Sequence, residues 1–298
     1  MRVLVSGASG LVGTEVIRQL RAEGHEALRL VRRKAVAEDE VEWNPANGYL
    51  QPGIMETIDA VVNMAGATTG KIPWTAKYKE EIVNSRLDST RTLVAAMHAA
   101  KHKPKVLVSG SASGFYGDSG DKLLDEKSPK GTGFLSDLAV AWEAEAFKAP
   151  SEVRVVTLRT TMVLSRRLGA LGRLLPILRA GLGGPLGSGK QWWAWISLTD
   201  EVRAIIHLMN NADARGAYNL TAPQSTTCRE LVDALGRAFK RPTLFAVPAF
   251  VLRLVFGLGA DELLLCNQRM SANRLLESGF RFTHPTIDQA AAWVAGRE

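Results

Sequence analysis

The chain has 298 residues, of which 46% are hydrophobic, and it carries a formal net charge of +7. This length allows one large domain, or one large and one small domain, with a sizeable core. Its basic residues are spread along the chain without interleaved aromatic residues, which argues against nucleic acid as a partner. Two cysteines and five histidines without metal-ligand spacing predict neither a disulfide framework nor a metal site.

No part of the sequence resembles a signal peptide or an apolar run long enough to span a bilayer. The longest nearly apolar stretch, 246–265, is interrupted by Pro248, Arg253 and Gly257 and by two acids. We expect this stretch to form a buried or partner-facing helix. The expected location is therefore the cytoplasm, with no membrane partner, and the sequence leaves the oligomeric state open.

The first predicted element is a strand over 3–6, which runs through a glycine-rich turn, SGASGLVG, into a helix over 14–23. Glycines in such a turn permit a tight bend, close approach of the backbone to a pyrophosphate, and close packing of helix on strand. A plain strand-to-helix connection also uses glycine. The combination favours a dinucleotide site at the helix N-terminus. Its expected members are Gly7, Ser9, Gly10, Leu11, Val12 and Gly13.

The second predicted strand, 27–31, ends where a dinucleotide fold meets the adenosine ribose. Arg32 and Arg33 follow that strand, where an NAD-binding protein would carry an acidic residue. Arginine binds a 2′-phosphate through charge-assisted hydrogen bonds, so the pair predicts NADP as the cofactor. The competing interpretation is a solvated basic turn.

Strands and helices continue to alternate through residue 160. Further strands are predicted over 60–63, 105–109 and 154–158, and further helices over 76–101 and 135–148. This alternation predicts an α/β fold with a Rossmann-type, doubly wound parallel sheet. We expect a dinucleotide-binding domain over 1–164 and a smaller substrate-side lobe over 165–298. That lobe is expected to interleave partly with the sheet and to carry helices over 199–211 and 228–240.

A long glycine-rich loop with three tryptophans, GLGGPLGSGKQWWAWISLTDE, begins at residue 181. Long loops inside compact chains are usually functional. Four of its side chains combine apolar walls with polar groups, as small-molecule sites do. We expect these four to line the mouth of the cofactor cleft and to contact the substrate: Lys190, Gln191, Trp192 and Trp195.

The glycine turn, NMAG (63–66) and SGSASGFYG (109–117) together resemble the extended short-chain dehydrogenase/reductase superfamily. Longer segments, including GFLSDLAVAWEAEA (133–146), are similar to its atypical epimerase-like family, which carries a characteristic C-terminal domain and lies within the NAD-dependent epimerase/dehydratase superfamily. The resemblance covers essentially the whole chain and implies NADP binding. It adds these expected cofactor contacts: Ala65, Gly66, Arg86, Ser109 and Arg159.

The chain departs from the superfamily in its catalytic pair. Typical members use Tyr-x-x-x-Lys, in which the lysine lowers the tyrosine pKa. Gly133 and Asp137 stand in those positions here, and neither can take over this chemistry. We therefore expect catalysis to use hydroxyls at the end of the 105–109 strand, namely Ser111 and Tyr116, with Ser113 as a substrate contact and the alternative catalytic serine.

Two functions remain open from sequence. The first is an NADP-dependent oxidoreductase or epimerase that acts on a small polar, sugar-like substrate. The second is a non-catalytic NADP(H)-binding sensor or partner-binding module on the same fold. The missing tyrosine–lysine pair favours the second function, whereas the tryptophan-rich loop favours the first.

Overall fold

The computed structural model describes residues 1–166, 172 and 174–297 and is built around an eight-stranded sheet. Its strand order is β12-β8-β6-β5-β1-β2-β3-β4. All neighbours in it are parallel except β3 and β4. The strands are β1 (Arg2–Ser6), β2 (Glu26–Val31), β3 (Glu40–Asn44), β4 (Tyr49–Leu50), β5 (Ala60–Asn63), β6 (Val106–Ala112), β8 (Arg154–Thr160) and β12 (Gly216–Leu220). The predicted doubly wound parallel sheet is confirmed.

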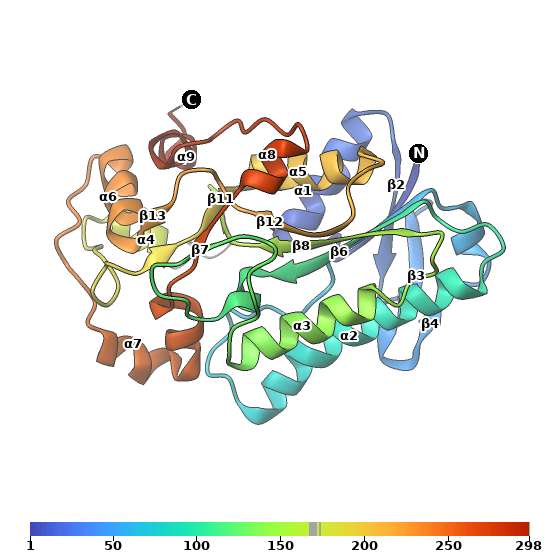
Figure 1. Ribbon diagram of the computed structural model, residues 1–298, viewed down its shortest axis with the longest axis horizontal. Coiled ribbons are helices and arrows are strands. Elements are labelled where there is room, and N and C mark those ends of the chain that lie inside the picture. Colours follow the sequence, from blue (N-terminus) through green and yellow to red (C-terminus); the bar gives the residue numbers. More distant parts are fainter. Residues whose placement is uncertain (167–171, 173, 298) are drawn as a thin grey trace.

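Helices cover both faces of this sheet (Figure 1). One face packs against α1 (Leu11–Ala22) and α5 (Leu198–Asn210), and the other against α2 (Ala76–Ala99) and α3 (Phe134–Ala146). Neighbouring residues of a strand point to opposite faces, so a strand covered on both sides is apolar throughout. In β1, Val3 and Val5 join the α1–α5 core, whereas Leu4 joins the core under α2.

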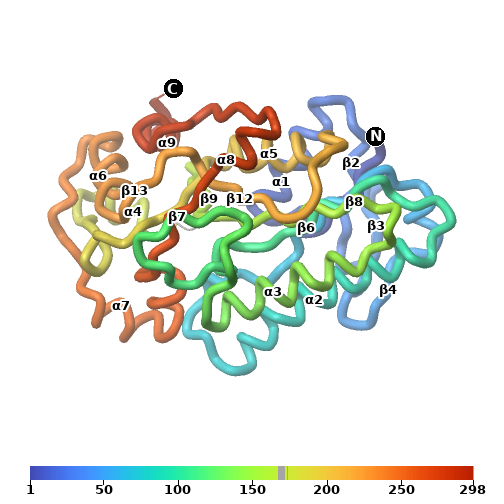
Figure 2. Tube along the Cα trace, viewed as in Figure 1, coloured from blue at the N-terminus to red at the C-terminus, as the bar shows by residue number. Residues whose placement is uncertain are grey.

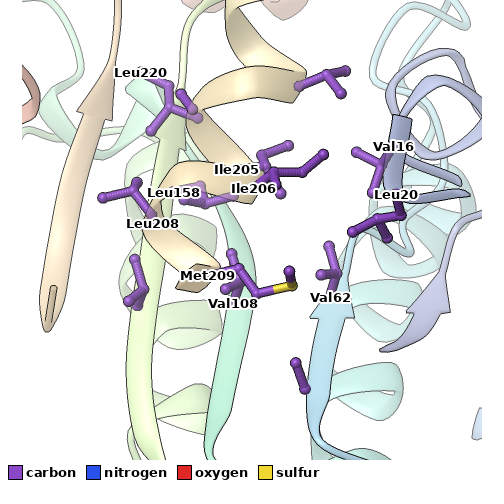
Figure 3. Close-up of a cluster of buried hydrophobic side chains, with 14 of the residues drawn as sticks. Val16, Leu20, Val62, Val108, Leu158, Ile205, Ile206, Leu208, Met209 and Leu220 are labelled. Atoms are coloured by element: carbon purple, nitrogen blue, oxygen red, sulfur yellow. The ribbon is translucent and has the colours of Figure 1, made fainter. Parts of the chain in front are cut away.

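In the core under α1 and α5, the buried residues of the helices pack against the apolar residues of the strands. Buried residues of α1 recur at positions 13, 16, 17 and 20, which places them on one side of the helix. Figure 3 shows side chains from both helices converging on the strands: Val16, Leu20, Ile205, Ile206 and Met209 lie against Val62, Val108 and Leu158.

Five of the eight sheet strands lie where the sequence predicts strands. The other three, β3, β4 and β12, were not predicted. β4 has only two residues, and β12 begins with a glycine and contains an asparagine, so neither resembles a buried strand in sequence. β12 follows α5 and pairs with β8, so the chain returns to the sheet after residue 165.

Most of the remaining helices form a second core beside the sheet, at the left in Figure 2. They are α4 (Leu174–Arg179), α6 (Cys228–Phe239), α7 (Ala249–Phe256), the π-helical turn η4 (Ala260–Leu265) and α9 (Ile287–Val294). The short helix α8 (Asn273–Glu277) packs on β12 and buries Leu275 in the core under α1 and α5. Three short strand pairs join this region to the rest: β9 (Met162–Leu164) with β11 (Trp195–Ser197), β10 (Trp192–Trp193) with β13 (Thr226–Thr227), and β7 (Leu123–Leu124) with β14 (Arg269–Met270).

The C-terminal residues are also fastened to the sheet region directly. The buried Asp200 carboxylate in the first turn of α5 accepts backbone N–H groups of Thr283 at 2.7 Å and His284 at 2.9 Å. Phe280 is buried in the core beneath α5. Residues near the end of the chain therefore complete the core of the first half.

The stretch 246–265 is divided between α7 and η4 and is not a buried helix. Of α7, only Leu252 is buried, while Phe250 is 70% and Leu254 is 84% exposed. Within the described residues, no helix is both long and apolar enough to cross a membrane.

Candidate functional site

The glycine turn leaves no room for side chains at two of its positions. An added Cβ at Gly7 would lie 2.5 Å from the Met64 carbonyl oxygen, and one at Gly13 would lie 2.2 Å from the Gly7 carbonyl oxygen. Gly7 also has φ +65°, which favours glycine. Gly10 is the N-cap of α1 and provides no side-chain cap, so the first N–H groups of the helix point past the end of β1. This geometry fits an anionic group such as a pyrophosphate.

The other predicted turn residues lie at the same helix start. Ser9 is exposed, whereas Leu11 and Val12, the first two residues of α1, are half-buried. Their backbone N–H groups belong to the first turn, where no intrahelical acceptor exists. Their contacts with a cofactor remain predictions.

Replacing Gly13 with alanine is expected to weaken NADPH binding at least tenfold and to destabilise the fold by about 1–3 kcal/mol. The reason is the 2.2 Å approach, which a methyl group cannot make without moving the turn. Fluorescence titration with NADPH and urea unfolding measure the two effects. Gly70→Ala is the control, since a Cβ there meets only Thr68 Oγ1, at 3.4 Å. An alanine variant that binds NADPH like the parent protein would contradict this account of the turn.

The loop after β5 is held beside the glycine turn by Ser6 and Asn63. Ser6 Oγ donates to Asn63 Oδ1 at 2.6 Å and accepts the backbone N–H groups of Met64 and Ala65, each at 3.0 Å. Ala65 and Gly66 thereby lie next to the turn, as the NMAG motif predicts for a cofactor contact. Sequence reasoning missed the two side chains that hold them there.

Arg86 on α2 is a half-buried cation without a carboxylate partner in the part of the chain that the structure describes. One of its terminal nitrogens donates to the carbonyl oxygens of Ala67 and Ile82, each at 3.0 Å. A Cβ at Gly66 would lie 3.0 Å from its guanidinium carbon. Burial lowers the pKa of Arg86 to about 10. Because a cation that is partly removed from water is stabilised by a counter-charge, this site fits an anionic ligand group.

The two arginines after β2 have different environments. Arg33 forms two hydrogen bonds with Glu40, at 2.8 and 2.6 Å, and is held away from other anions by them. Arg32 is exposed, and among the described residues it has no ion pair. The structure therefore favours Arg32 over Arg33 as the group available to a 2′-phosphate.

Ser109 is fully buried within β6, which contradicts its predicted contact with the cofactor. The next residue, Gly110, leaves space for the indole of Trp142, since a Cβ at Gly110 would lie 2.7 Å from that ring. The Trp142 indole N–H donates to Thr90 Oγ1 at 3.0 Å. Trp142 therefore has a packing role.

Beneath the end of β6 lies a buried polar network, which we define as Ser111, Tyr116, Glu143, Arg159 and Asn219. Ser111 Oγ donates to Glu143 Oε1 at 2.7 Å, and Arg159 donates to both oxygens of that carboxylate, at 2.8 and 3.0 Å. Arg159 also donates to the Tyr116 hydroxyl at 2.9 Å, and that hydroxyl donates to Asn219 Oδ1 at 2.7 Å. The guanidinium lies 3.5 Å from the centre of the Phe115 ring.

This network corrects two predictions. Arg159 is not free to bind a cofactor, because its N–H groups are bonded to Glu143, to Tyr116 and to the Glu126 carbonyl oxygen. Tyr116 is fully buried. Burial is the largest cause of the shift that raises the pKa of Tyr116 to about 12. A phenol in that environment does not exchange protons near neutral pH.

The network also limits Ser111. Its hydroxyl proton is donated to Glu143, so the serine oxygen can accept a hydrogen bond but cannot donate the same proton to a substrate. Ser113, at the start of the 3₁₀ turn η3 (Ser113–Tyr116), is half-buried, and within the described residues its hydroxyl has no hydrogen-bond partner. The serine predicted as the alternative is therefore the more available one.

The tryptophan-rich loop turns two of its four predicted substrate contacts inward. Gln191 is 5% exposed, and its amide donates to the carbonyl oxygens of Leu186 and Leu264. Trp195 is 1% exposed and lies in the core of the C-terminal region. These residues do not line an opening, because β10 pairs with β13 beside α6, and β11 pairs with β9 beside α5. Lys190 is exposed, and Trp192 is half-buried with its N–H donated to Asp121 at 2.8 Å.

Two family models match most of the chain. Residues 3–221 match the family model described as the NAD dependent epimerase/dehydratase family, and residues 247–294 match a domain of unknown function, DUF1731. "Epimerase family protein Mb2239" of Mycobacterium bovis is 40% identical over 296 residues, covering 99% of this chain and 98% of that protein. "Epimerase family protein SDR39U1" of Homo sapiens is 35% identical over 295 residues, covering 97% and 98%.

Two solved structures are also similar to the chain. The crystal structure of human epimerase family protein SDR39U1 (isoform 2) with NADPH has a TM-score of 0.93 and 32% identity, with both chains fully covered. A nucleoside-diphosphate sugar epimerase from Corynebacterium glutamicum has a TM-score of 0.81 and 28% identity; the match covers all of this chain and 59% of that one.

Proposed function

The chain belongs to the NAD-dependent epimerase/dehydratase family, and on that premise we propose that it binds NADP(H) at the carboxyl ends of β1, β2 and β5. The observation that carries this proposal is Arg86, a half-buried cation that lacks a carboxylate partner among the described residues and lies beside Gly66. The human relative crystallised with NADPH supports the same cofactor.

Each part of the site has a role in this proposal. The glycine turn and the start of α1 bind the pyrophosphate through backbone N–H groups, and the backbone at Ala65 and Gly66 allows close approach. Arg32 pairs with the 2′-phosphate, and Arg86 supplies positive charge near the strand ends. NADP(H), when bound, supplies or accepts a hydride.

We further propose that the protein is an epimerase-like or oxidoreductase enzyme for a small polar, sugar-like substrate. The available hydroxyl of Ser113 and the accepting oxygen of Ser111 lie at the end of β6, where ligands of open α/β sheets bind. Lys190 and Trp192 are the loop residues with accessible surface. The Corynebacterium relative described as a nucleoside-diphosphate sugar epimerase supports this substrate class.

One observation favours a second function, a non-catalytic NADP(H)-binding sensor or partner-binding module. The buried polar network engages the hydroxyl protons of both Ser111 and Tyr116, the two residues expected to act on a substrate. To separate the two functions, NADPH oxidation is followed at 340 nm with a panel of aldehydes, ketones and nucleotide-linked keto sugars. Turnover of any member supports the enzyme, whereas binding without turnover across the panel supports the sensor.

Replacing Arg32 with alanine is expected to remove most of the preference for NADPH over NADH, about 30- to 100-fold. Charge-assisted hydrogen bonds to the 2′-phosphate form only with the phosphorylated cofactor, and they contribute about 1.5–3 kcal/mol. Arg33→Ala is expected to change the ratio less than about threefold, because Glu40 already holds that guanidinium. Fluorescence titration with both cofactors gives the ratios.

The two single variants serve as each other's control, since each removes one positive charge from the same turn. Equal affinity of the parent protein for NADH and NADPH would refute the assignment of NADP(H). A larger effect from Arg33 than from Arg32 would show that Glu40 releases its partner on binding.

A further inference from the structure

The π-helical turn η4, within the segment that matches the domain of unknown function, contacts three segments around the candidate site. At its start, a Cβ at Gly259 would lie 3.6 Å from the Trp74 ring, in the loop between β5 and α2. At its end, the Leu264 carbonyl oxygen accepts the Gln191 amide and the Trp193 indole N–H, each at 3.0 Å. Figure 1 shows this segment, which follows α7, beside the first turn of α3. η4 therefore connects the loop after β5, the start of α3 and the tryptophan-rich loop.

In the middle of this turn, the Glu262 carboxylate lies next to Gly133, where a side chain on that residue would begin. Gly133, which precedes α3 at the position of the superfamily's tyrosine, has φ +110°. A Cβ there would lie 3.3 Å from Glu262 Cδ and Oε1 and 3.4 Å from Oε2. The two carboxylate oxygens accept the backbone N–H groups of Phe134, at 3.0 Å, and Leu135, at 2.7 Å. The C-terminal segment thus brings a carboxylate to where α3 provides no side chain.

No basic side chain is bonded to this carboxylate in the described part of the chain. The neighbouring acid Asp261 is different, since it pairs with Arg253 at 2.9 Å. Asp137, in the first turn of α3, is exposed and pairs with Lys130 at 3.0 Å. Among these three acids, only Glu262 is bound solely through backbone N–H groups, so its charge is balanced only by dipoles.

The sheet order defines which half of a dinucleotide lies near Glu262. The pyrophosphate belongs at β1, and the adenosine belongs toward β2, where Arg32 lies. The nicotinamide half then extends to the other side of β1, over the ends of β5 and β6. The start of α3 packs on the turn that follows β6: Ser136 Oγ donates to the Phe115 carbonyl oxygen at 2.9 Å. Glu262 is therefore on the nicotinamide side of the site.

We propose that Glu262 is the acidic group of the nicotinamide half of the site, and that it makes the protein bind NADP⁺ more tightly than it would without that charge. The inference rests on the proposed NADP(H) binding. The oxidised nicotinamide ring carries a positive charge that the reduced ring lacks. A carboxylate in a partly buried site attracts the oxidised form selectively. The domain of unknown function then contributes directly to the cofactor site.

The test compares the dissociation constants of NADP⁺ and NADPH by calorimetry for the parent protein, Glu262→Gln and Glu262→Ala. We expect the NADP⁺ constant to rise about tenfold in both variants and the NADPH constant to change less than about twofold. Glutamine and alanine differ in how they cap α3, but both remove the charge. An effect of charge is therefore equal in the two variants, whereas an effect of capping is not.

Asp261→Asn is the matched control, since it removes a neighbouring carboxylate that is paired with Arg253 and is expected to leave both constants unchanged. Thermal unfolding of each variant verifies that it is folded. If both cofactor forms weaken equally in the Glu262 variants, or neither does, the inference is overturned and Glu262 only caps α3. If the parent protein binds neither form, the proposed function fails as well, so the two failures are distinguishable.

Discussion

Replacing Arg159 with methionine is expected to lower the free energy of unfolding by about 3–5 kcal/mol. The substitution leaves the Glu143 carboxylate buried, since Glu143 is 6% exposed, and without the only cationic partner that it has among the described residues. It also removes a hydrogen bond from the Tyr116 hydroxyl and the stacking contact with Phe115. Removing one member of a buried ion pair costs more than the pair contributes, because the remaining charge stays desolvated.

The double variant Arg159→Met with Glu143→Leu tests this explanation. Because it removes both charges and fills the space with apolar side chains, it is expected to recover at least half of the lost stability. Urea unfolding of the parent, the single variant and the double variant provides the comparison. A double variant that is less stable than the single one would show that packing and hydrogen bonds, and not the unpaired charge, dominate the effect.

Replacing Glu201 with glutamine is expected to stabilise the protein increasingly as the pH rises from 5 to 8. Glu201 is fully buried in the first turn of α5, Thr160 Oγ1 donates to its Oε1 at 2.8 Å, and among the described residues its Oε2 has no partner. Burial raises the pKa of Glu201 to about 8 from a usual value of 4.5. The carboxyl group is therefore protonated in the folded protein at neutral pH.

The direction in which stability changes with pH follows from proton linkage. In the unfolded chain the carboxyl ionises near its usual pKa of 4.5, so between that value and about 8 the folded state binds more protons than the unfolded state. The stability of the parent protein then falls with rising pH by up to about 1.4 kcal/mol per pH unit, and the full contribution is present only below the unfolded pKa. Glutamine does not titrate, so the stability difference between variant and parent widens across this range.

Urea unfolding at pH 5, 6.5 and 8 measures this difference. The control is Glu277→Gln, at the end of α8. Parallel pH profiles for the parent and Glu201→Gln would mean that the carboxyl group is already ionised in the folded state at pH 5.

The sequence predicted the glycine turn because all of its information is local. Strand, turn and helix follow one another within about twenty residues, and the steric reasons for Gly7 and Gly13 lie in the same segment or in the adjoining loop. The parallel strands could be recognised for the same reason, since strands covered on both faces are continuous apolar runs.

The buried polar network could not be predicted in this way. Its members are far apart in sequence: 103 residues separate Tyr116 from Asn219, and 43 separate Tyr116 from Arg159. Each residue type has an ordinary interpretation on its own, and only the packing of β6, α3, β8 and β12 brings them together. Glu262 lies even farther from its partners, 128 residues from Phe134, and no motif connects the two.

The tryptophan-rich loop shows a different limit. Its composition indicated a functional loop, but composition does not say which side chains point inward. The two-residue strand β10 and the three-residue strand β11 decide that, and strands this short are not visible in sequence. Trp193 and Trp195 therefore belong to the core, while Trp192 remains near the surface.

The parallel pairing of β14 with β7, together with the bonds from Asp200 to residues 283 and 284, has a consequence for how this protein can change over evolution. A C-terminal segment that supplies a strand partner, core side chains and acceptors for the other half cannot be exchanged as an independent module. Substitutions on the two sides of these contacts must be inherited together. A chimera that joins residues 3–221 to the corresponding tail of a distant relative is expected to fold only if the residues facing Asp200, Leu123 and Gly133 are transplanted with it.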